Sequence, residues 1–136
     1  MRQETVGSGR RFRFIKAWQR ADDFVVSVYR ATQAFPKDER YGLVTQMRRA
    51  SVSVAANIVE GSARRSRQEY LQFLFIAKAS LSEVSYYLHL SHRLDYLSEA
   101  QFNELDGLCE ETARTLYGLI QSNSQEQEAM RAEIHA

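Results

Sequence analysis

The stretch "RRASVSVAANIVEGSARRSRQEY", residues 48–70, holds the end of one predicted helix and the start of the next. Apolar residues recur in its first half at steps of three and four, which is the period of one helical face. Gly61 can end that helix in a left-handed conformation at no steric cost. Ser66 and Glu69 form the S-x-x-E spacing in which a hydroxyl and a carboxylate satisfy free backbone N–H groups at a helix start. The stretch therefore predicts two helices joined by a short turn at 62–66.

The same period extends outward on both sides of this stretch. Before it, an apolar face runs from Phe14 to Phe35 and stops at the single proline, and the second helix is predicted to begin near Asp38. After it, the third helix reaches about residue 93, and a fourth opens with Ser98 and Gln101. No strand-like alternation appears. The sequence therefore predicts an all-α, antiparallel up-down four-helix bundle over 14–122, with a basic, flexible leader at 1–13 and a polar tail at 123–136.

Composition limits the classes of protein that the chain can belong to. Its 136 residues are 44% hydrophobic, which is enough for one core. The lone cysteine, Cys109, cannot close a disulfide within the chain. No apolar run approaches the roughly 20 residues that span a bilayer, and the first residues lack the apolar segment of a signal peptide. We therefore expect a soluble, cytoplasmic protein with no membrane partner.

Charge is distributed unevenly along the chain despite a net charge of only +1. Residues 1–67 carry 14 Lys/Arg against 6 Asp/Glu, whereas residues 68–136 carry 4 against 11. One half of the chain is therefore basic and the other acidic.

The third predicted helix is apolar around most of its circumference. One stripe suffices for a bundle, yet further apolar residues lie outside it: Leu71, Phe75, Ile76, Tyr86, Tyr87 and Leu90. In a monomer such a helix would expose a large apolar patch, so we expect a second copy of the chain to cover part of it. The alternative is that this helix lies unusually deep within its own bundle.

Two segments resemble a known family. They read "FPKDERYGLVTQMRRASVSVAANIVEG" at 35–61 and "SRQEYLQFLFIAKASLSEVSYYLHLSHRLDYLS" at 66–98. They are similar to the bacterial four helix bundle proteins first noticed as reading frames in intervening sequences of 23S ribosomal RNA genes. More distant relatives include the accessory variability proteins of diversity-generating retroelements. The resemblance covers about 14–98 and implies a bundle that assembles into a barrel-like homopentamer, with nucleic-acid binding proposed for the family and no enzymatic activity.

A narrow polar stripe lies beside the apolar face of the second helix, and a similar one lies on the third. Antiparallel packing around the turn at 62–66 would place Arg49 beside Glu83 and Asn57 beside Phe73 or Ile76. We interpret this polar seam as a structural device that fixes helix register or subunit orientation. Its members are Gln46, Arg49, Ser53, Asn57, Glu60, Ser80 and Glu83.

Arginines outside the seam are the candidate nucleic-acid-binding residues. One group leads into the first helix and the other is expected to lie exposed in the turn between the second and third helices. Phosphate backbones bind such clusters through counterion release, and Tyr41 and Tyr70 are candidates for stacking on bases. The alternative is that these side chains solvate the surface or pair with the acidic fourth helix of another subunit. The candidates are Arg10, Arg11, Arg13, Lys16, Arg20, Arg64, Arg65 and Arg67.

Residue patterns for catalysis or metal binding are missing from the sequence. The Glu-x-x-His motif of di-metal bundles does not occur, and His89 and His92 have no obvious further ligand. No phosphate-binding glycine loop, acyl-transfer serine motif or Arg/His pair of helical ribonucleases is found. We therefore expect no enzyme, no cofactor and no metal, and the partners expected are further copies of the chain and nucleic acid, with RNA favoured. The rival hypothesis is an oligomeric scaffold that docks a protein partner and binds no nucleic acid.

Overall fold

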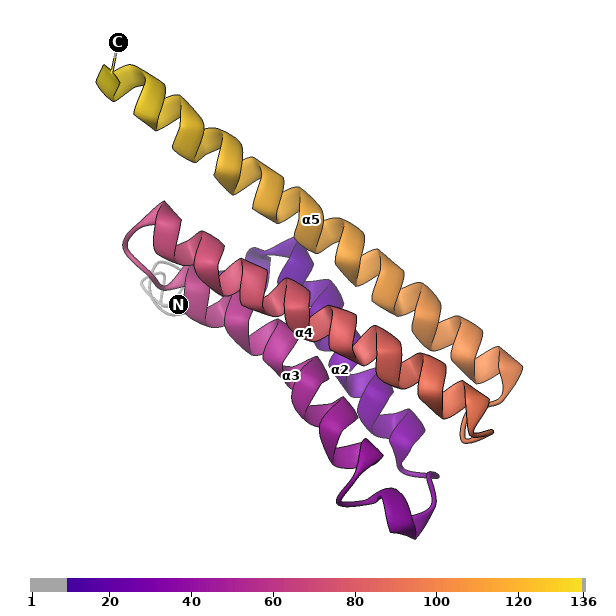
Figure 1. The fold of residues 1–136 in the computed structure, drawn as a ribbon. Helices are drawn as coiled ribbons and strands as arrows, with labels where there is room; N and C mark the ends of the chain where they lie inside the picture. The colour runs from indigo at the N-terminus through magenta and orange to yellow at the C-terminus, as the bar shows by residue number, and fades with distance from the viewer. Residues whose placement is uncertain (1–9, 136) are drawn as a thin grey trace, which may run out of the picture.

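The computed structural model describes residues 10–135, and helices account for nearly all of them (Figure 1). Two short 3-10 helices, η1 (Arg11–Phe14) and η2 (Lys37–Glu39), precede the first and second long helices. The long helices are α2 (Lys16–Thr32), α3 (Leu43–Ser62), α4 (Arg67–Arg93) and α5 (Glu99–His135). Within residues 10–135 there is no β-strand, so the fold is all-α with four long helices.

The four long helices lie side by side and alternate in direction (Figure 1). Each packs against its neighbours in sequence, and α5 closes the arrangement by packing against α2. Arg20 of α2 and Glu111 of α5 form an ion pair of 2.7 Å in this closing seam. The connections are short, as expected where consecutive helices are antiparallel neighbours.

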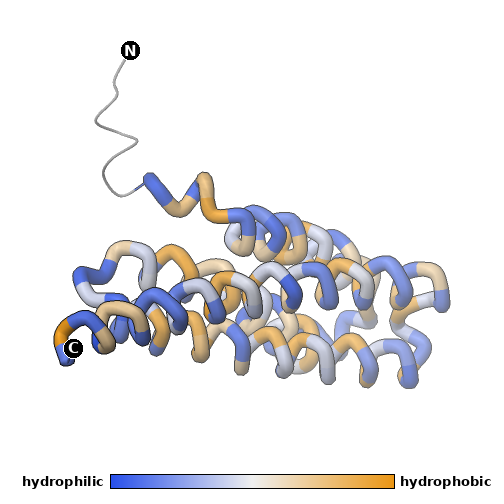
Figure 2. The backbone as a smooth tube through the Cα atoms, turned by 90° about the horizontal axis from the view of Figure 1, so that it is seen from above, coloured by the Kyte–Doolittle hydropathy of each residue, from blue (hydrophilic) through white to orange (hydrophobic). Residues whose placement is uncertain are grey.

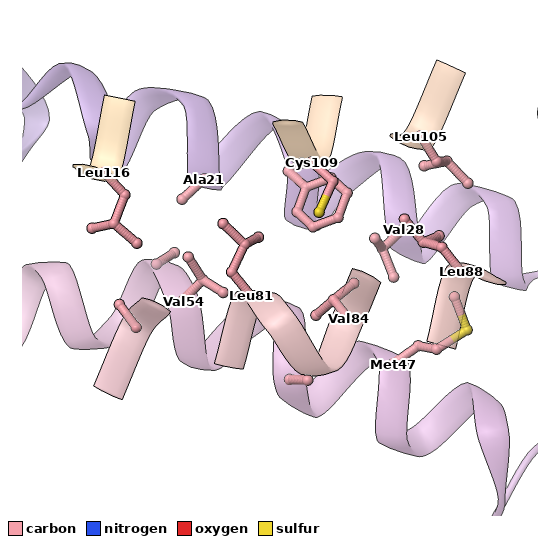
Figure 3. Close-up of a cluster of buried hydrophobic side chains, with 14 of the residues drawn as sticks. Ala21, Val28, Met47, Val54, Leu81, Val84, Leu88, Leu105, Cys109 and Leu116 are labelled. Atoms are coloured by element: carbon pink, nitrogen blue, oxygen red, sulfur yellow. The ribbon is translucent and has the colours of Figure 1, made fainter. Parts of the chain in front are cut away.

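Apolar side chains from all four helices meet along the axis of the bundle (Figure 3). Phe24 of α2, Met47 of α3, Leu74 of α4 and Leu116 of α5 are each at most 1% exposed. Polar and apolar residues alternate along every helix, as expected for helices with one apolar face (Figure 2). Complete burial of one such side chain stabilises a fold by about 1.5–3 kcal/mol, so this core provides the main driving force for folding.

Helix starts follow the sequence signals at two places. Ser66 Oγ accepts a hydrogen bond of 3.1 Å from the Glu69 N–H at the start of α4. Ser98 and Gln101 form a complete capping box, because the Gln101 N–H donates to Ser98 Oγ and the Ser98 N–H donates to Gln101 Oε1. These caps confirm the predicted starts of the third and fourth helices.

The end of α4 has a geometry that the sequence did not reveal. Asp95 has a φ of 61°, in the left-handed region where glycine is usual. Its N–H donates to the His92 carbonyl, and the Tyr96 N–H donates to the Ser91 carbonyl, which together make a Schellman motif.

Three predicted helix boundaries are wrong. Gly61 lies inside α3 with a negative φ, so it is not a left-handed cap. Asp38 belongs to η2, and α3 begins only at Leu43. The first long helix ends at Thr32, before Pro36, and Arg48 of α3 caps its last turn by donating to Thr32 Oγ1 and to the Tyr29 carbonyl.

The segment 123–135, separated above as a polar tail, continues α5 as a helix. Figure 1 shows this end of α5 projecting beyond the turn between α3 and α4. Asn123, at its base, is 4% exposed and receives a hydrogen bond of 2.6 Å from Arg67. The bundle therefore extends at least one residue into the predicted tail.

Candidate nucleic-acid interface

Basic side chains gather at the end of the bundle where α3 turns into α4. The alternating directions bring η1 and the start of α2 to this same end, and η1 contacts α3. Described residues here include seven cations from two separate stretches of sequence, namely Arg10, Arg11, Arg13, Lys16, Arg64, Arg65 and Arg67. We call this group the basic end.

Arg64 and Arg65 lie in the turn and are exposed. Arg64 is within 3.3 Å of Glu60 Oε2, and its guanidinium stacks 4.7 Å from the centroid of the Phe73 ring. Both members of the Arg64–Glu60 pair are well exposed, so solvent screens the pair and little energy opposes an exchange of Glu60 for a phosphate. These two arginines are therefore available to a ligand.

Arg67 does not lie exposed in the turn, contrary to the prediction. It is the first residue of α4, half-buried, and it binds α5 through Asn123 Oδ1 and Glu126 Oε2, both at 2.6 Å. The prediction failed because it did not place the last turns of α5 beside the turn. Arg67 therefore fastens the start of α4 to α5.

The leader arginines are ordered by an aromatic contact where the structure describes them. Phe12 packs edge-on against Trp18 with ring centroids 4.9 Å apart, and the Gln19 side chain donates to the Arg13 carbonyl at 2.7 Å. Arg10, Arg11 and Arg13 all remain exposed. The predicted leader also includes 1–9, which lie outside the described residues.

Lys16 and Arg20 behave differently from each other. Lys16, the first residue of α2, is exposed at the basic end. Arg20 is only 32% exposed and is paired with Glu111 of α5. Arg20 therefore stabilises the closing seam between α2 and α5 of its own chain, so it is not a candidate for binding nucleic acid.

A hollow of about 410 Å³ opens at the basic end. It is lined by Arg64, Arg65, Ser66, Arg67, Tyr70 and Met130. Burial raises the pKa of the Tyr70 hydroxyl, and nearby Arg67 opposes that rise. Tyr70 thus borders the arginines as a neutral aromatic ring, whereas Tyr41 lies in the connection between α2 and α3 at the opposite end of the bundle. The two tyrosines cannot contribute to one stacking surface.

The polar seam contains a compact hydrogen-bonded cluster at its centre. Ser53 Oγ of α3 and Ser80 Oγ of α4 are 2.8 Å apart, and Asn57 Nδ2 donates to Ser53 Oγ at 3.0 Å and to the Ser53 carbonyl at 2.8 Å. The Asn57 amide thus has its hydrogen bonds within α3. Glu60 is exposed and faces Arg64.

The predicted ion pair between Arg49 and Glu83 is not formed. Both residues border one shallow hollow with Gln46, yet among the described residues Arg49 has no acidic partner within ion-pairing distance. Glu83 instead accepts a hydrogen bond of 3.1 Å from the Tyr87 hydroxyl. Both side chains are exposed, so each is solvated without the other.

Two of the groups that could support other chemistry, His92 and Cys109, are held in packing contacts. His92 stacks on Phe102 at 4.4 Å, while His89 is exposed. Cys109 is 5% exposed, and burial raises the pKa of its thiol to about 11. No cluster of three or more potential metal-ligating side chains occurs among residues 10–135. None of the described helices is both long and apolar enough to cross a bilayer.

Comparison with known families agrees with the helical topology. The family model described as 23S rRNA-intervening sequence protein matches residues 13–118. The chain belongs to this family. A comparison with curated protein sequences found no match.

A solved structure shows the same fold. It is a protein with unknown function from the S23 ribosomal protein family of Bacteroides thetaiotaomicron. The TM-score is 0.71 at 23% identity, over 77% of this chain and 95% of that one. At this identity the similarity establishes the architecture of this 23S rRNA-intervening sequence family member and leaves its ligand to be argued from the site.

Proposed function

We propose that this family member is a non-enzymatic protein that binds nucleic acid, with RNA the expected ligand, through its basic end. The observation that carries the proposal is the convergence of two sequence-distant groups of exposed cations on that end. Arg10, Arg11, Arg13 and Lys16 come from the start of the chain, and Arg64 and Arg65 come from the turn after α3. Cations gathered on one surface release condensed counterions when they contact a phosphate backbone.

The hollow beside Arg64 and Arg65 offers a concave surface next to these cations. A phosphate can contact the guanidinium groups, and the Tyr70 ring at the edge offers limited area to a base. Two carboxylates contact the arginines that line this hollow, because Glu60 lies 3.3 Å from Arg64 and Glu126 of α5 lies 2.6 Å from Arg67. The acidic character of α5 therefore limits the ligand's footprint to the side of the end formed by η1 and the turn.

A matched pair of double variants tests the proposal. Arg64→Gln with Arg65→Gln should weaken binding of a labelled single-stranded RNA in fluorescence anisotropy at low salt. It should also reduce the slope of log affinity against log salt by about 0.7 for each phosphate that the variant no longer neutralises. The control is Arg30→Gln with Arg93→Gln, which removes the same charge from exposed positions at the other end of α2 and α4.

The location of the charge distinguishes the two variants. Equal weakening of binding in both would show that net charge alone governs binding. No measurable binding by the parent protein would favour the rival function, a scaffold that docks a protein partner.

We also propose that the chain self-associates, and the outer face of α4 supports this proposal. Phe75, Ile76 and Tyr86 are 51%, 49% and 57% exposed. Leu71, included above among the surplus apolar residues, is buried in the core and needs no second copy to cover it. The pentamer is favoured over other assemblies only by the family resemblance.

A further inference from the structure

A second hollow, of about 600 Å³, lies at the end of the bundle opposite the basic end. It is lined by the end of α2, the connection between α2 and α3, and the start of α3, none of which the function proposed above uses. Its lining combines cations with hydroxyl, amide and apolar groups. The lining residues are Thr32, Gln33, Phe35, Pro36, Lys37, Arg40, Tyr41, Val44, Thr45 and Arg48.

Arg48 is the fixed cation of this hollow. Its Nε donates to Thr32 Oγ1 at 2.9 Å, one terminal amino group donates to the Tyr29 carbonyl at 3.2 Å, and the guanidinium lies 4.6 Å from the centroid of the Tyr29 ring. All three contacts are with neutral groups. Within residues 10–135 no carboxylate approaches Arg48 closely enough to form an ion pair, so a half-buried positive charge remains uncompensated. Such a charge is stabilised by an anion that reaches it through the hollow.

Lys37 and Arg40 surround the same hollow with two exposed charges. Among the described residues neither forms an ion pair with the neighbouring Glu39, whose two oxygens accept from the Leu43 N–H at 3.3 Å and the Tyr96 hydroxyl at 2.8 Å. Asp38 is exposed and is not part of the lining. The hollow is therefore bordered by three cations and no carboxylate of the described residues.

Tyr41 stands at the rim of this hollow with 87% of its surface exposed. A phenol ring that lies so far outside the core, beside uncompensated cations, offers a face on which a planar base can stack. Apolar lining from Phe35, Pro36 and Val44 complements such a ring.

We infer that this second hollow binds a nucleotide, with the phosphate at Arg48, Arg40 and Lys37 and the base against Tyr41. The nucleotide can be free or can be an unpaired residue of an RNA strand. The site is separate from the basic end, so its test does not depend on the function proposed above.

Calorimetry at low salt with three small probes tests the assignment of ligand class. Uridine 5′-monophosphate should bind, inorganic phosphate should bind more weakly, and uridine should show no measurable heat. Tyr41→Ala should weaken binding of the nucleotide and leave binding of inorganic phosphate unchanged. Binding of uridine as tight as that of its monophosphate, or no binding of either phosphate-containing probe, would overturn the inference.

Matched charge variants test the position of the site. Lys37→Gln with Arg40→Gln should lower the affinity for uridine 5′-monophosphate about tenfold or more, because charge-assisted hydrogen bonds contribute more than neutral ones. Arg64→Gln with Arg65→Gln should leave that affinity within about twofold of the parent protein's. The reverse pattern would move the nucleotide to the basic end and overturn the inference, whatever the RNA affinity of either variant.

A competition experiment then distinguishes the two sources of nucleotide. If single-stranded RNA displaces the monophosphate from the parent protein and also from the Arg64→Gln, Arg65→Gln variant, the site accepts nucleotides within a strand. If RNA fails to displace it, the ligand is a free nucleotide. Either result supports a nucleotide site.

Discussion

The missing side chain of Gly61 allows α3 and α4 to approach each other closely just before the turn. A Cβ built at this position would lie 2.8 Å from Phe73 Cβ and 2.8 Å from Tyr70 Cδ1. The Tyr70 ring can rotate away, but Phe73 Cβ moves only if the backbone of α4 moves. Gly61 is therefore required by the distance between two helices rather than by its own backbone dihedrals.

We predict that Gly61→Ala lowers the free energy of unfolding by about 1–3 kcal/mol, because it overpacks this contact. Thermal unfolding followed by circular dichroism measures the change. Gly118→Ala is the control, since nothing lies within 4 Å of its added Cβ, and alanine there should stabilise the helix by up to about 1 kcal/mol. Equal effects of the two substitutions would contradict the close approach.

Cys109 makes stability depend on pH in the alkaline range. Its thiol pKa is raised from 9.0 to about 11, mainly by burial and further by Asp106 and Glu110. Above about pH 9 the thiol ionises in the unfolded chain but stays protonated in the folded one, so the stability present below that pH is lost as the pH rises toward 11.

The predicted consequence is a decrease in stability of up to about 2 kcal/mol across this range that Cys109→Ala does not share. Urea unfolding at pH 8 and near pH 10.5 measures it, and the comparison cancels the titration of tyrosines common to both proteins. Parallel pH profiles for the two proteins would show that the thiol is accessible to water.

At the scale of the helices, predictions from local spacing succeeded and those from distant packing failed. The caps at Ser66 and Ser98 were predictable because each depends on residues within one turn. The contact of Arg67 with Glu126 was not, because 59 positions separate them and nothing in their local sequence marks α5 as long enough to reach the turn. The antiparallel register places Arg49 and Glu83 near each other, but both side chains are exposed, so water solvates each charge and no ion pair is required.

The ion pair between α4 and α5 leads to a prediction about binding. Glu126→Gln should raise RNA affinity several-fold in anisotropy, because it frees Arg67 and removes one negative charge from the basic end. Stability should change by less than about 1 kcal/mol, since the pair is partly exposed. Glu104→Gln removes the same charge from an exposed site on α5 far from that end and should have little effect on either quantity. Equal gains from both variants would exclude a specific role for Arg67.

At the scale of the whole molecule, two cation-rich hollows lie at opposite ends of one bundle. The sequence showed the uneven charge between the halves of the chain, and it predicted the exposure of two of the three arginines of the turn, Arg64 and Arg65, but not the partial burial of Arg67. It did not indicate that Lys37, Arg40 and Arg48 share a hollow, because their grouping depends on the path of the chain between α2 and α3.

We predict that the chain forms an oligomer through the outer face of α4. Light scattering at micromolar concentration should give a mass that is a multiple of 15.7 kDa. Ile76→Glu should lower that mass, because it places a charge in the centre of the apolar face. Ser85→Glu adds the same charge at an exposed polar position half a turn around α4 from Ile76 and serves as the control. A monomer from the parent protein would contradict the prediction.

The packing of α5 against α2 also has a consequence for the order of the chain. Each helix lies between two others, so none of the four is required to come first. The start of α2 and the last core turns of α5 lie toward the same end of the bundle. A flexible linker between them, with new termini opened in the turn at 94–98, should give a circular permutant that keeps all four interhelical seams, because chain ends are best tolerated at exposed turns.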